Sequence, residues 1–238
     1  MLSIKMKRNA FRVLATLAFA AAPAFASLIP VNNYSFETYP LLNGTGCTAP
    51  CAYDIGAIPD WGATAGTSGQ IQLGGPANTF PNALFFTRSD GPTSAFSNDA
   101  TLSQTVGATV GVGTAYTLSV AIGQRMDSGS YGGSADLLIG ATALNGNVAH
   151  TILAVGTAPT LGNWSTFTTP TYWGTAADAG ATITIELKSV GGVDAQGLQR
   201  QGNFDNVQLD GVPEPASFLL IGSALLALKA FRRRRPIA

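Results

Sequence analysis

Two runs of alternating apolar and polar residues most constrain the fold of this chain. In Tyr116–Ile122 every second residue is a large apolar one, and Ile183–Leu187 repeats the pattern. Successive side chains of a β-strand point to opposite faces, so this period of two is typical of a half-buried strand. Both runs therefore predict antiparallel strands with one face against a core.

Further short apolar segments alternate with clusters of Gly, Pro, Ser, Thr and Asn. These segments predict additional strands at Leu84–Phe86, Leu137–Ile139, Ile152–Val155 and Val207–Leu209. The intervening stretches are interpreted as loops, the longest being 42–60, 62–69, 74–81, 125–134 and 191–202. We expect an all-β fold, a two-sheet antiparallel β-sandwich of the jelly-roll type, over residues 27–211.

The first 26 residues have the layout of a secretory signal peptide. A basic start is followed by the apolar run Val13–Ala22 and by the small residues Ala24 and Ala26. This order predicts an N-terminal signal helix that is removed after Ala26. The body is then exported.

Charge is unevenly distributed along the chain. The whole sequence has 13 basic and 13 acidic residues, but four of the basic ones lie in the leader and five lie after Pro215. Residues 27–211 keep 4 basic and 12 acidic residues, a net charge of −8. Nucleic acid binding needs clustered Lys and Arg, so nucleic acid is excluded as a partner of the body.

The two cysteines, Cys47 and Cys51, stand close together in the segment GCTAPC. Export to an oxidising compartment favours a disulfide between them. Two thiolates alone do not supply the four ligands of a structural zinc site. A pair of free thiols remains the alternative.

The body has no catalytic motif in its sequence. It contains one histidine, His150, and no HExxH, GxSxG or P-loop pattern. Several of its acids stand in turn-forming segments such as SDG and SND, which explains them without catalysis. We therefore predict a non-enzymatic protein. A secreted glycoside hydrolase stays open as an alternative, because its paired carboxylates are defined by distance in space.

The last segment, residues 212–238, combines Pro213-Glu214-Pro215 with the apolar run Phe218–Leu228 and the basic end Arg232-Arg233-Arg234-Arg235. A helix of fourteen residues spans about 21 Å, less than the hydrocarbon core of about 30 Å. Because Lys and Arg side chains can snorkel, residues 216–231 still predict a single transmembrane helix in the inner membrane. The arginines would stay cytoplasmic. Transient retention is favoured over a lasting anchor, which remains the alternative.

This order of proline motif, apolar segment and basic end resembles the PEP-CTERM sorting signal of Gram-negative bacteria. The resemblance implies recognition by an exosortase, a membrane peptidase that cuts near the motif. It also implies export through the inner membrane, delivery to the cell surface or extracellular matrix, and an association with exopolysaccharide and biofilm.

Five short segments of the body carry a second resemblance: Val31–Glu37, Pro59–Trp61, Ser103–Thr105, Tyr116–Ser119 and Asn203–Leu209. Together they resemble the jelly-roll carbohydrate-binding modules of the galactose-binding-like superfamily, although Asn33 replaces the usual glycine. The resemblance implies the sandwich fold and an extracellular polysaccharide as a partner. A module with one defined glycan ligand is an alternative to a general matrix role.

The same resemblance implies a structural calcium where the first and last strands meet, with Glu37 and Asp205 as candidate ligands. Asp205 has the strand parity of Val207 and Leu209, so it would point inward if those two face the core. A buried carboxylate is costly unless it is paired or coordinated. A hydrogen-bonded Asp at a strand end is the alternative reading.

Sugar binding requires an aromatic face that stacks on CH groups, with hydrogen-bonding side chains around it. Trp61, Tyr131 and Trp173 lie in or beside expected loops and are the candidate ligand-binding residues. Each of them has a core position as its alternative. Trp164 is interpreted as a core residue, together with Phe167.

Overall fold

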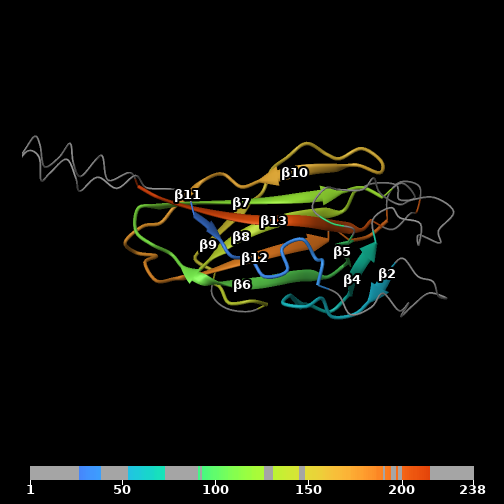
Figure 1. Ribbon diagram of the computed structural model, residues 1–238, viewed down its shortest axis with the longest axis horizontal. Helices are drawn as coiled ribbons and strands as arrows, with labels where there is room; N and C mark the ends of the chain where they lie inside the picture. Colours follow the sequence, from blue (N-terminus) through green and yellow to red (C-terminus); the bar gives the residue numbers. More distant parts are fainter. Residues whose placement is uncertain are drawn as a thin grey trace, which may run out of the picture. The chain divides into compact units, whose positions relative to one another are not determined.

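Every regular element in the described part of the chain is a β-strand (Figure 1). The computed structural model describes residues 27–38, 53–72, 91, 93–125, 131–144, 148–189, 191–193, 197 and 200–214. Those between 27 and 211 belong to one compact unit. Among the described residues there is no helix that could cross a membrane. The predicted signal helix, transmembrane helix and Leu84–Phe86 strand lie outside them.

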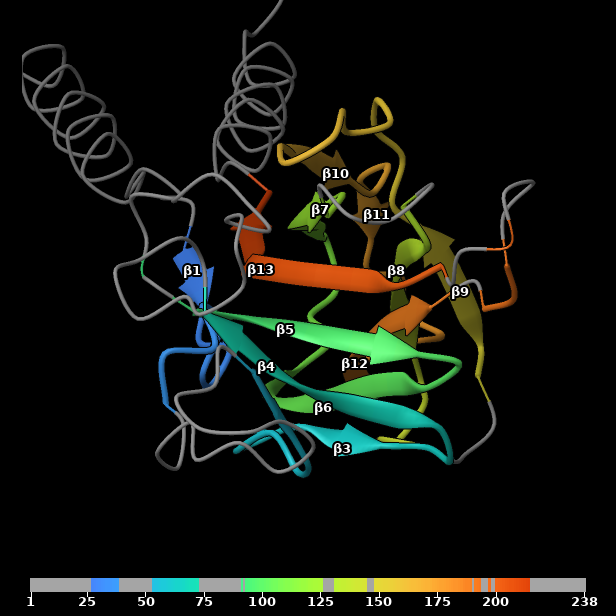
Figure 2. The ribbon, with the colours of Figure 1, turned by 90° about the vertical axis from the view of Figure 1, so that its right-hand side faces the viewer.

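The strands form two antiparallel sheets, one of eight strands and one of five. The larger sheet has the order β10 (Trp164–Thr168), β7 (Thr114–Gly123), β13 (Gly202–Pro213), β5 (Thr93–Asn98), β4 (Thr67–Gln72) and β2 (Tyr53–Ile55), with β1 (Ser27–Ile29) on β13 and β11 (Tyr172–Trp173) on β7. The smaller sheet has the order β3 (Gly62–Ala63), β6 (Thr101–Thr109), β12 (Thr182–Ser189), β8 (Gly133–Ile139) and β9 (His150–Leu153). Figure 2 shows β13, β5 and β4 side by side. The predicted two-sheet sandwich is thus confirmed.

The core lies between the sheets and is built by the alternation that the sequence shows. On β7, the side chains of Leu118, Val120 and Ile122 are fully buried, and on β12 those of Ile183 and Ile185 are too. Burial of each such side chain stabilises the fold by roughly 1.5–3 kcal/mol. The polar residues between them face away from the core, as the period of two requires.

Several strands lie where the sequence pattern indicated loops. β2, β3 and the first half of β4 fall within stretches 42–60 and 62–69. Their residues are mostly small or polar, so the alternation that marks a strand is missing from the sequence. At the other end of the body, the predicted strand Val207–Leu209 is the middle of the much longer β13.

β13 is interrupted by a local irregularity at Asn206, which has a φ of 46°. Phe204, Val207 and Leu209 all belong to the core, although Phe204 and Val207 differ in parity. The residue with positive φ shifts the alternation by one position, as a β-bulge does. Asp205 therefore lies on the face opposite to Phe204, and the predicted inward direction of Asp205 is wrong.

The first and last strands of the body pair with each other. Ser27 lies opposite Gly211, and Ile29 lies opposite Leu209. Because the pair is antiparallel, β1 begins at the end of the sandwich where β13 finishes. The predicted start of the exported chain, Ser27, therefore lies beside Gly211, the last residue of the compact unit.

The outer face of the smaller sheet is covered by the segment that follows β8. The Ala143 N–H donates to Thr105 Oγ1 (2.8 Å), and Thr184 Oγ1 donates to the Ala141 carbonyl (2.7 Å). Ala141 and Thr184 are buried as a result. This layer leaves the outer face of the larger sheet as the more promising place for a binding site.

Candidate functional site

The outer face of the larger sheet carries an unusual set of buried residues. Ala95 and Phe204 are cross-strand partners, and both belong to the core. Alternation then places Ser94 and Phe96 of β5 on the outer face, together with Asn203 of β13, which pairs with Phe96. We call this surface the outer-sheet face.

An aromatic and apolar cluster forms one half of the outer-sheet face. Ile71 and Phe96 are buried, and Tyr53 and Trp164 pack against them. The rings of Tyr53 and Phe96 meet edge to face, with centroids 6.3 Å apart. Four strands supply these side chains, and β10 is the most distant of them from β2 in the sheet order.

Glycines make room for this cluster. Gly123 lies opposite Trp164 in the β7–β10 pair, and Gly69 lies opposite Phe96 in the β4–β5 pair. A Cβ atom at Gly69 would approach the Phe96 ring to 3.0 Å and overlap the carbonyl oxygen of Asp54. The absence of a side chain there lets the Phe96 ring lie against the sheet.

Buried polar groups form the other half of the face. Ser94, Asn203 and Asp205 are each at most 1% exposed. Asp205 Oδ1 accepts a hydrogen bond from the Asn206 N–H (2.8 Å). Ser94 Oγ and Asn203 Oδ1 have no hydrogen-bond partner among the described residues. Buried polar atoms are normally hydrogen-bonded, so the two oxygens are the unsatisfied acceptors of this face.

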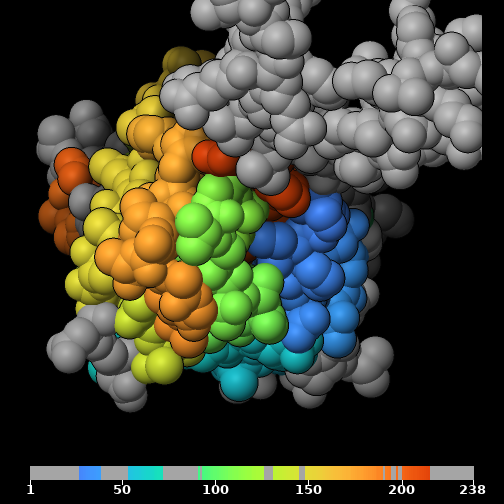
Figure 3. Space-filling model, turned by 90° about the vertical axis from the view of Figure 1, so that its left-hand side faces the viewer, coloured from blue at the N-terminus to red at the C-terminus, as the bar shows by residue number. Residues whose placement is uncertain are grey.

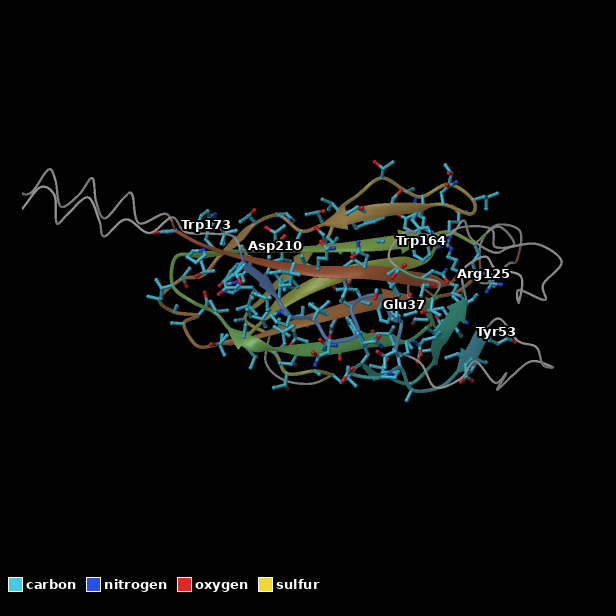
Figure 4. All side chains as sticks on the ribbon, in the orientation of Figure 1. Glu37, Tyr53, Arg125, Trp164, Trp173 and Asp210 are labelled. Atoms are coloured by element: carbon cyan, nitrogen blue, oxygen red, sulfur yellow. The ribbon has the colours of Figure 1, made fainter. Side chains whose placement is uncertain are left out.

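One end of the sandwich gathers the exposed parts of this site. Figure 4 shows Tyr53, Trp164 and Arg125 together at that end. Arg125 Nη1 donates to Gln201 Oε1 (3.0 Å), which joins the end of β7 to the start of β13. The site therefore combines aromatic rings, a guanidinium group and buried hydrogen-bonding groups.

The three predicted ligand-binding residues do not form one site. Trp61 is a core residue, with its ring 5.4 Å from that of Phe36. Tyr131 is half-buried, with its ring 5.9 Å from that of Phe167. Trp173 is 51% exposed, but it lies at the end of the sandwich opposite to Trp164 (Figure 4).

The sequence reading missed Tyr53, Phe96 and Trp164. Phe167 faces the core, and Trp164 stands three residues before it on the same strand. An odd separation puts two strand residues on opposite faces, so Trp164 and Phe167 cannot both be core residues. This parity was the signal that could have identified Trp164.

The predicted calcium ligands are both engaged in hydrogen bonds within the protein. Glu37 Oε1 accepts from the Thr93 N–H (3.0 Å), and Asp205 Oδ1 accepts from the Asn206 N–H. No group of three or more His, Cys, Asp or Glu side chains gathers among the described residues. Calcium needs six to eight oxygens, so backbone carbonyls and further side chains would have to join these two carboxylates. The calcium site stays a prediction.

The described residues include only the first part of the sorting motif. Pro213 is the last residue of β13, and Glu214 follows it outside any strand. Pro215, the four arginines at 232–235 and the Cys47–Cys51 pair lie outside the described residues.

A second polar cluster surrounds Asp178, away from the outer-sheet face. Asp178 accepts hydrogen bonds from Thr175 Oγ1 and from the Tyr172 hydroxyl (2.6 Å), and it contacts His150 Nε2 (3.1 Å). The bonds from Thr175 and Tyr172 lower the pKa of the Asp178 carboxyl. Burial and the bond to Asp178 raise the pKa of Tyr172 to about 12. The cluster ties β9 and β11 to the loop before β12.

A hollow of about 280 Å³ lies beside β6, lined by Pro30, Asn32 and Gln104–Ala108. The amide group of Gln104 is already bonded to the Asn32 backbone and to the Asp60 carbonyl at 2.8–3.0 Å. With the Gln104 amide engaged, this hollow is less suited to a polar ligand than the outer-sheet face.

Fold and site together define a β-sandwich protein with an aromatic and polar sheet face and a C-terminal sorting segment. A family model described as HpiC1-like, HpiC1 cyclase, matches residues 27–210, and the model of the PEP-CTERM protein-sorting motif matches residues 211–235. The chain belongs to the HpiC1-like family and carries a PEP-CTERM sorting motif. No curated protein matches the chain.

Solved structures similar to this chain include two xylan-binding domains and an adhesin domain. The CBM22-1 domain of Paenibacillus barcinonensis Xyn10C has 15% identity and a TM-score of 0.41, covering 68% of this chain and 97% of its own. The CBM22-2 domain of the same protein has 14% identity and a TM-score of 0.42, and the match covers 65% of this chain and 92% of that domain. The K1 cleaved adhesin domain of Lys-gingipain from Porphyromonas gingivalis W83 has 9% identity and a TM-score of 0.38, and the match covers 81% of this chain and 99% of that domain.

Proposed function

We propose that the chain is exported, held transiently in the inner membrane by its tail, and released to the cell surface or matrix by an exosortase. The match of the PEP-CTERM motif to residues 211–235 carries this proposal. Pro213 ends β13, so the folded body leads directly into the motif. The alternative of a lasting anchor predicts that the tail is kept.

The sorting step is tested in a host that has the matching exosortase. Glu214→Ala is expected to leave export intact and to make the protein accumulate as a membrane-bound precursor. Intact-mass analysis of surface protein gives the readout. Wild-type surface protein that still carries residues 216–238 contradicts the proposal and favours the plain anchor.

We further propose that the mature body is a non-enzymatic binder of extracellular polysaccharide and uses the outer-sheet face. The combination of Trp164 and Tyr53 with the buried polar groups of Ser94 and Asn203 supports it. An aromatic ring packs against the CH groups of a sugar, and buried donors and acceptors select its hydroxyl groups. The net charge of −8 on residues 27–211 favours a neutral glycan over an acidic one.

A glycan array on the mature protein tests this binding, followed by affinity measurements on variants. Trp164→Ala and Asn203→Ala are each expected to weaken binding about tenfold, a change of about 1.4 kcal/mol. Trp173→Ala is the matched control, because it removes the same ring type at the opposite end of the sandwich. Equal losses in Trp164→Ala and Trp173→Ala would place the ligand elsewhere.

The family description raises a cyclase as a second candidate function. Asp205 favours it, because a carboxyl group that is 1% exposed on a face with aromatic side chains can act as a general acid or base. The substrate would be a largely apolar molecule that the aromatic cluster holds. Asp205→Asn separates the candidates. A cyclase would keep ligand binding and lose conversion, whereas a binding protein shows no conversion in either form.

A further inference from the structure

Three large apolar side chains are exposed at the end of the sandwich where β13 leads into the sorting motif. They are Leu28 (60% exposed), Val112 (63%) and Trp173 (51%). Leu28 belongs to β1, Val112 to the turn between β6 and β7, and Trp173 to β11. We call these three residues the apolar end.

Backbone pairing and hydrogen bonds bring the three segments to the same place. Leu28 pairs with Asp210 near the end of β13, and Trp173 pairs with Ala115 at the start of β7. The Gly113 N–H, next to Val112, donates to the carbonyl of Gly174 (2.8 Å). Figure 4 shows Trp173 and Asp210 at one end, and Figure 3, which views the molecule from that side, shows the blue N-terminal segment beside green and orange segments.

The charges at this end do not attract an anionic partner. The titratable groups at this end include Asp210, which pairs with Leu28, Glu214, which follows β13, and the Asp178 cluster with His150. Arg125 lies at the opposite end of the sandwich (Figure 4), and Lys188 is held by Asp136 at 2.7 Å near the start of β8. An electrostatic contact with acidic lipid headgroups is therefore disfavoured, and the attraction must come from the apolar side chains.

The length of the connection sets how far this end can lie from the bilayer. Between Pro213 and the predicted membrane segment 216–231 there are two residues, Glu214 and Pro215. Three residue steps span at most about 11 Å. The headgroup region on each side of the bilayer is roughly 5–8 Å thick. The end of β13 is therefore held at the headgroup surface whenever the tail is embedded.

We propose that the apolar end docks on the lipid bilayer during sorting, with Trp173 in the interfacial region and Leu28 and Val112 beside it. This inference rests on the proposed function, since the tail must be in the membrane. Trp is favoured at the interface because its ring is apolar and its N–H stays hydrogen-bonded. After cleavage the body loses its tether, and three side chains alone hold it only weakly, so it leaves the membrane.

Tryptophan quenching in nanodiscs tests the docking, because the chain has only Trp61, Trp164 and Trp173 and none in the tail. The uncleaved protein, residues 27–238, is reconstituted in phosphatidylcholine that carries bromine on the acyl carbons nearest the headgroup. Bromine is expected to quench part of the emission. The quenching is expected to disappear in Trp173→Phe and to persist in the matched control Trp164→Phe. Val112→Asp is expected to reduce it.

The outcomes of this experiment distinguish a failure of the membrane docking from a failure of the proposed sorting function. Protein that does not stay with the nanodiscs contradicts the sorting function and the docking together. Protein that stays with the nanodiscs but shows no quenching contradicts the docking alone. In that second case, slower processing of Val112→Asp in an exosortase-containing host would assign the apolar end to the peptidase instead of the lipid.

Discussion

Asp178 shows how much of the local structure can depend on one carboxylate. It accepts hydrogen bonds from Thr175 and Tyr172 and contacts the ring of His150. Asp178→Asn is expected to lower the melting temperature by roughly 2–4 °C, the usual effect of losing one favourable interaction in a domain of this size. Thermal melting of the mature protein at pH 7 measures the difference.

The pH dependence of that difference follows from the direction of the pKa shift. The folded state lowers the pKa of the Asp178 carboxyl, so its stabilising effect is present above the unfolded value of about 4. It is lost as the pH falls through the folded pKa. The gap between wild type and Asp178→Asn is therefore expected to shrink below about pH 4. A gap that is independent of pH would contradict the assigned hydrogen bonds.

The pKa of Tyr172 is shifted in the opposite direction, so its contribution to stability depends on pH in the opposite way. Its pKa is raised to about 12, above the ordinary value of about 10, so the neutral hydroxyl is the stabilising form. That contribution is complete below about pH 10 and is lost as the pH rises toward 12. An ultraviolet titration of the phenolate is expected to show one tyrosine that ionises late. Its disappearance in Tyr172→Phe would identify the residue.

The candidate site was predictable from the sequence only in part. The strand pattern of the sequence predicts that Asp205 is buried, and it is 1% exposed. Its direction was mistaken, because the positive φ of Asn206 that shifts the alternation leaves no mark in the residue pattern. Trp164 was missed although its parity with Phe167 was readable. Trp61 stands beside an expected loop in the sequence, but its ring is in the core.

At the scale of a strand, Gly69 holds β4 close to both of its neighbours. Gly69→Ala is expected to destabilise the body by about 2 kcal/mol, because the new Cβ would overlap the Asp54 carbonyl oxygen and press on Phe96. Denaturant unfolding measures the loss. Gly56→Ala is the matched control, since a Cβ there meets nothing within 4 Å. Equal effects of the two variants would show that the packing on Gly69 is unimportant.

The irregularity in β13 makes a separate prediction at the same scale. Asn206 has a φ of 46°, which a β-branched side chain adopts only with strain. Asn206→Val is expected to cost about 1–3 kcal/mol of stability, whereas Asn206→Gly should be nearly neutral. Urea melts of both variants provide the comparison. A well-tolerated valine would mean that β13 is regular at this point.

The strands that the residue pattern predicts differ physically from those that it does not predict. β7 and β12 have one face in the core and one outside, and their large apolar residues recur with a period of two. β4, with the sequence TSGQIQ, presents Gly69 and Gln70 where an apolar residue would mark a strand. Its position is fixed by pairing with β5 and β2 and not by its own pattern.

For the molecule as a whole, the pairing of β1 with β13 constrains how the leader is removed. Cleavage after Ala26 leaves Ser27 opposite Gly211 and keeps β1 intact. The exported protein is therefore expected to begin at Ser27. N-terminal sequencing of the secreted material provides the check. A start beyond Ile29 would remove β1 and contradict the assigned site.

The same pairing brings the first and last residues of the body close together. Directly opposite residues of an antiparallel pair have Cα atoms about 4.5–5.5 Å apart, so Ser27 and Gly211 lie within reach of a short peptide link. A head-to-tail ring should therefore close without disturbing either sheet, and new ends can be opened in an exposed loop such as the one at Thr157–Ala158. The order of the strands along the backbone would change, while every neighbour in the sandwich stays the same.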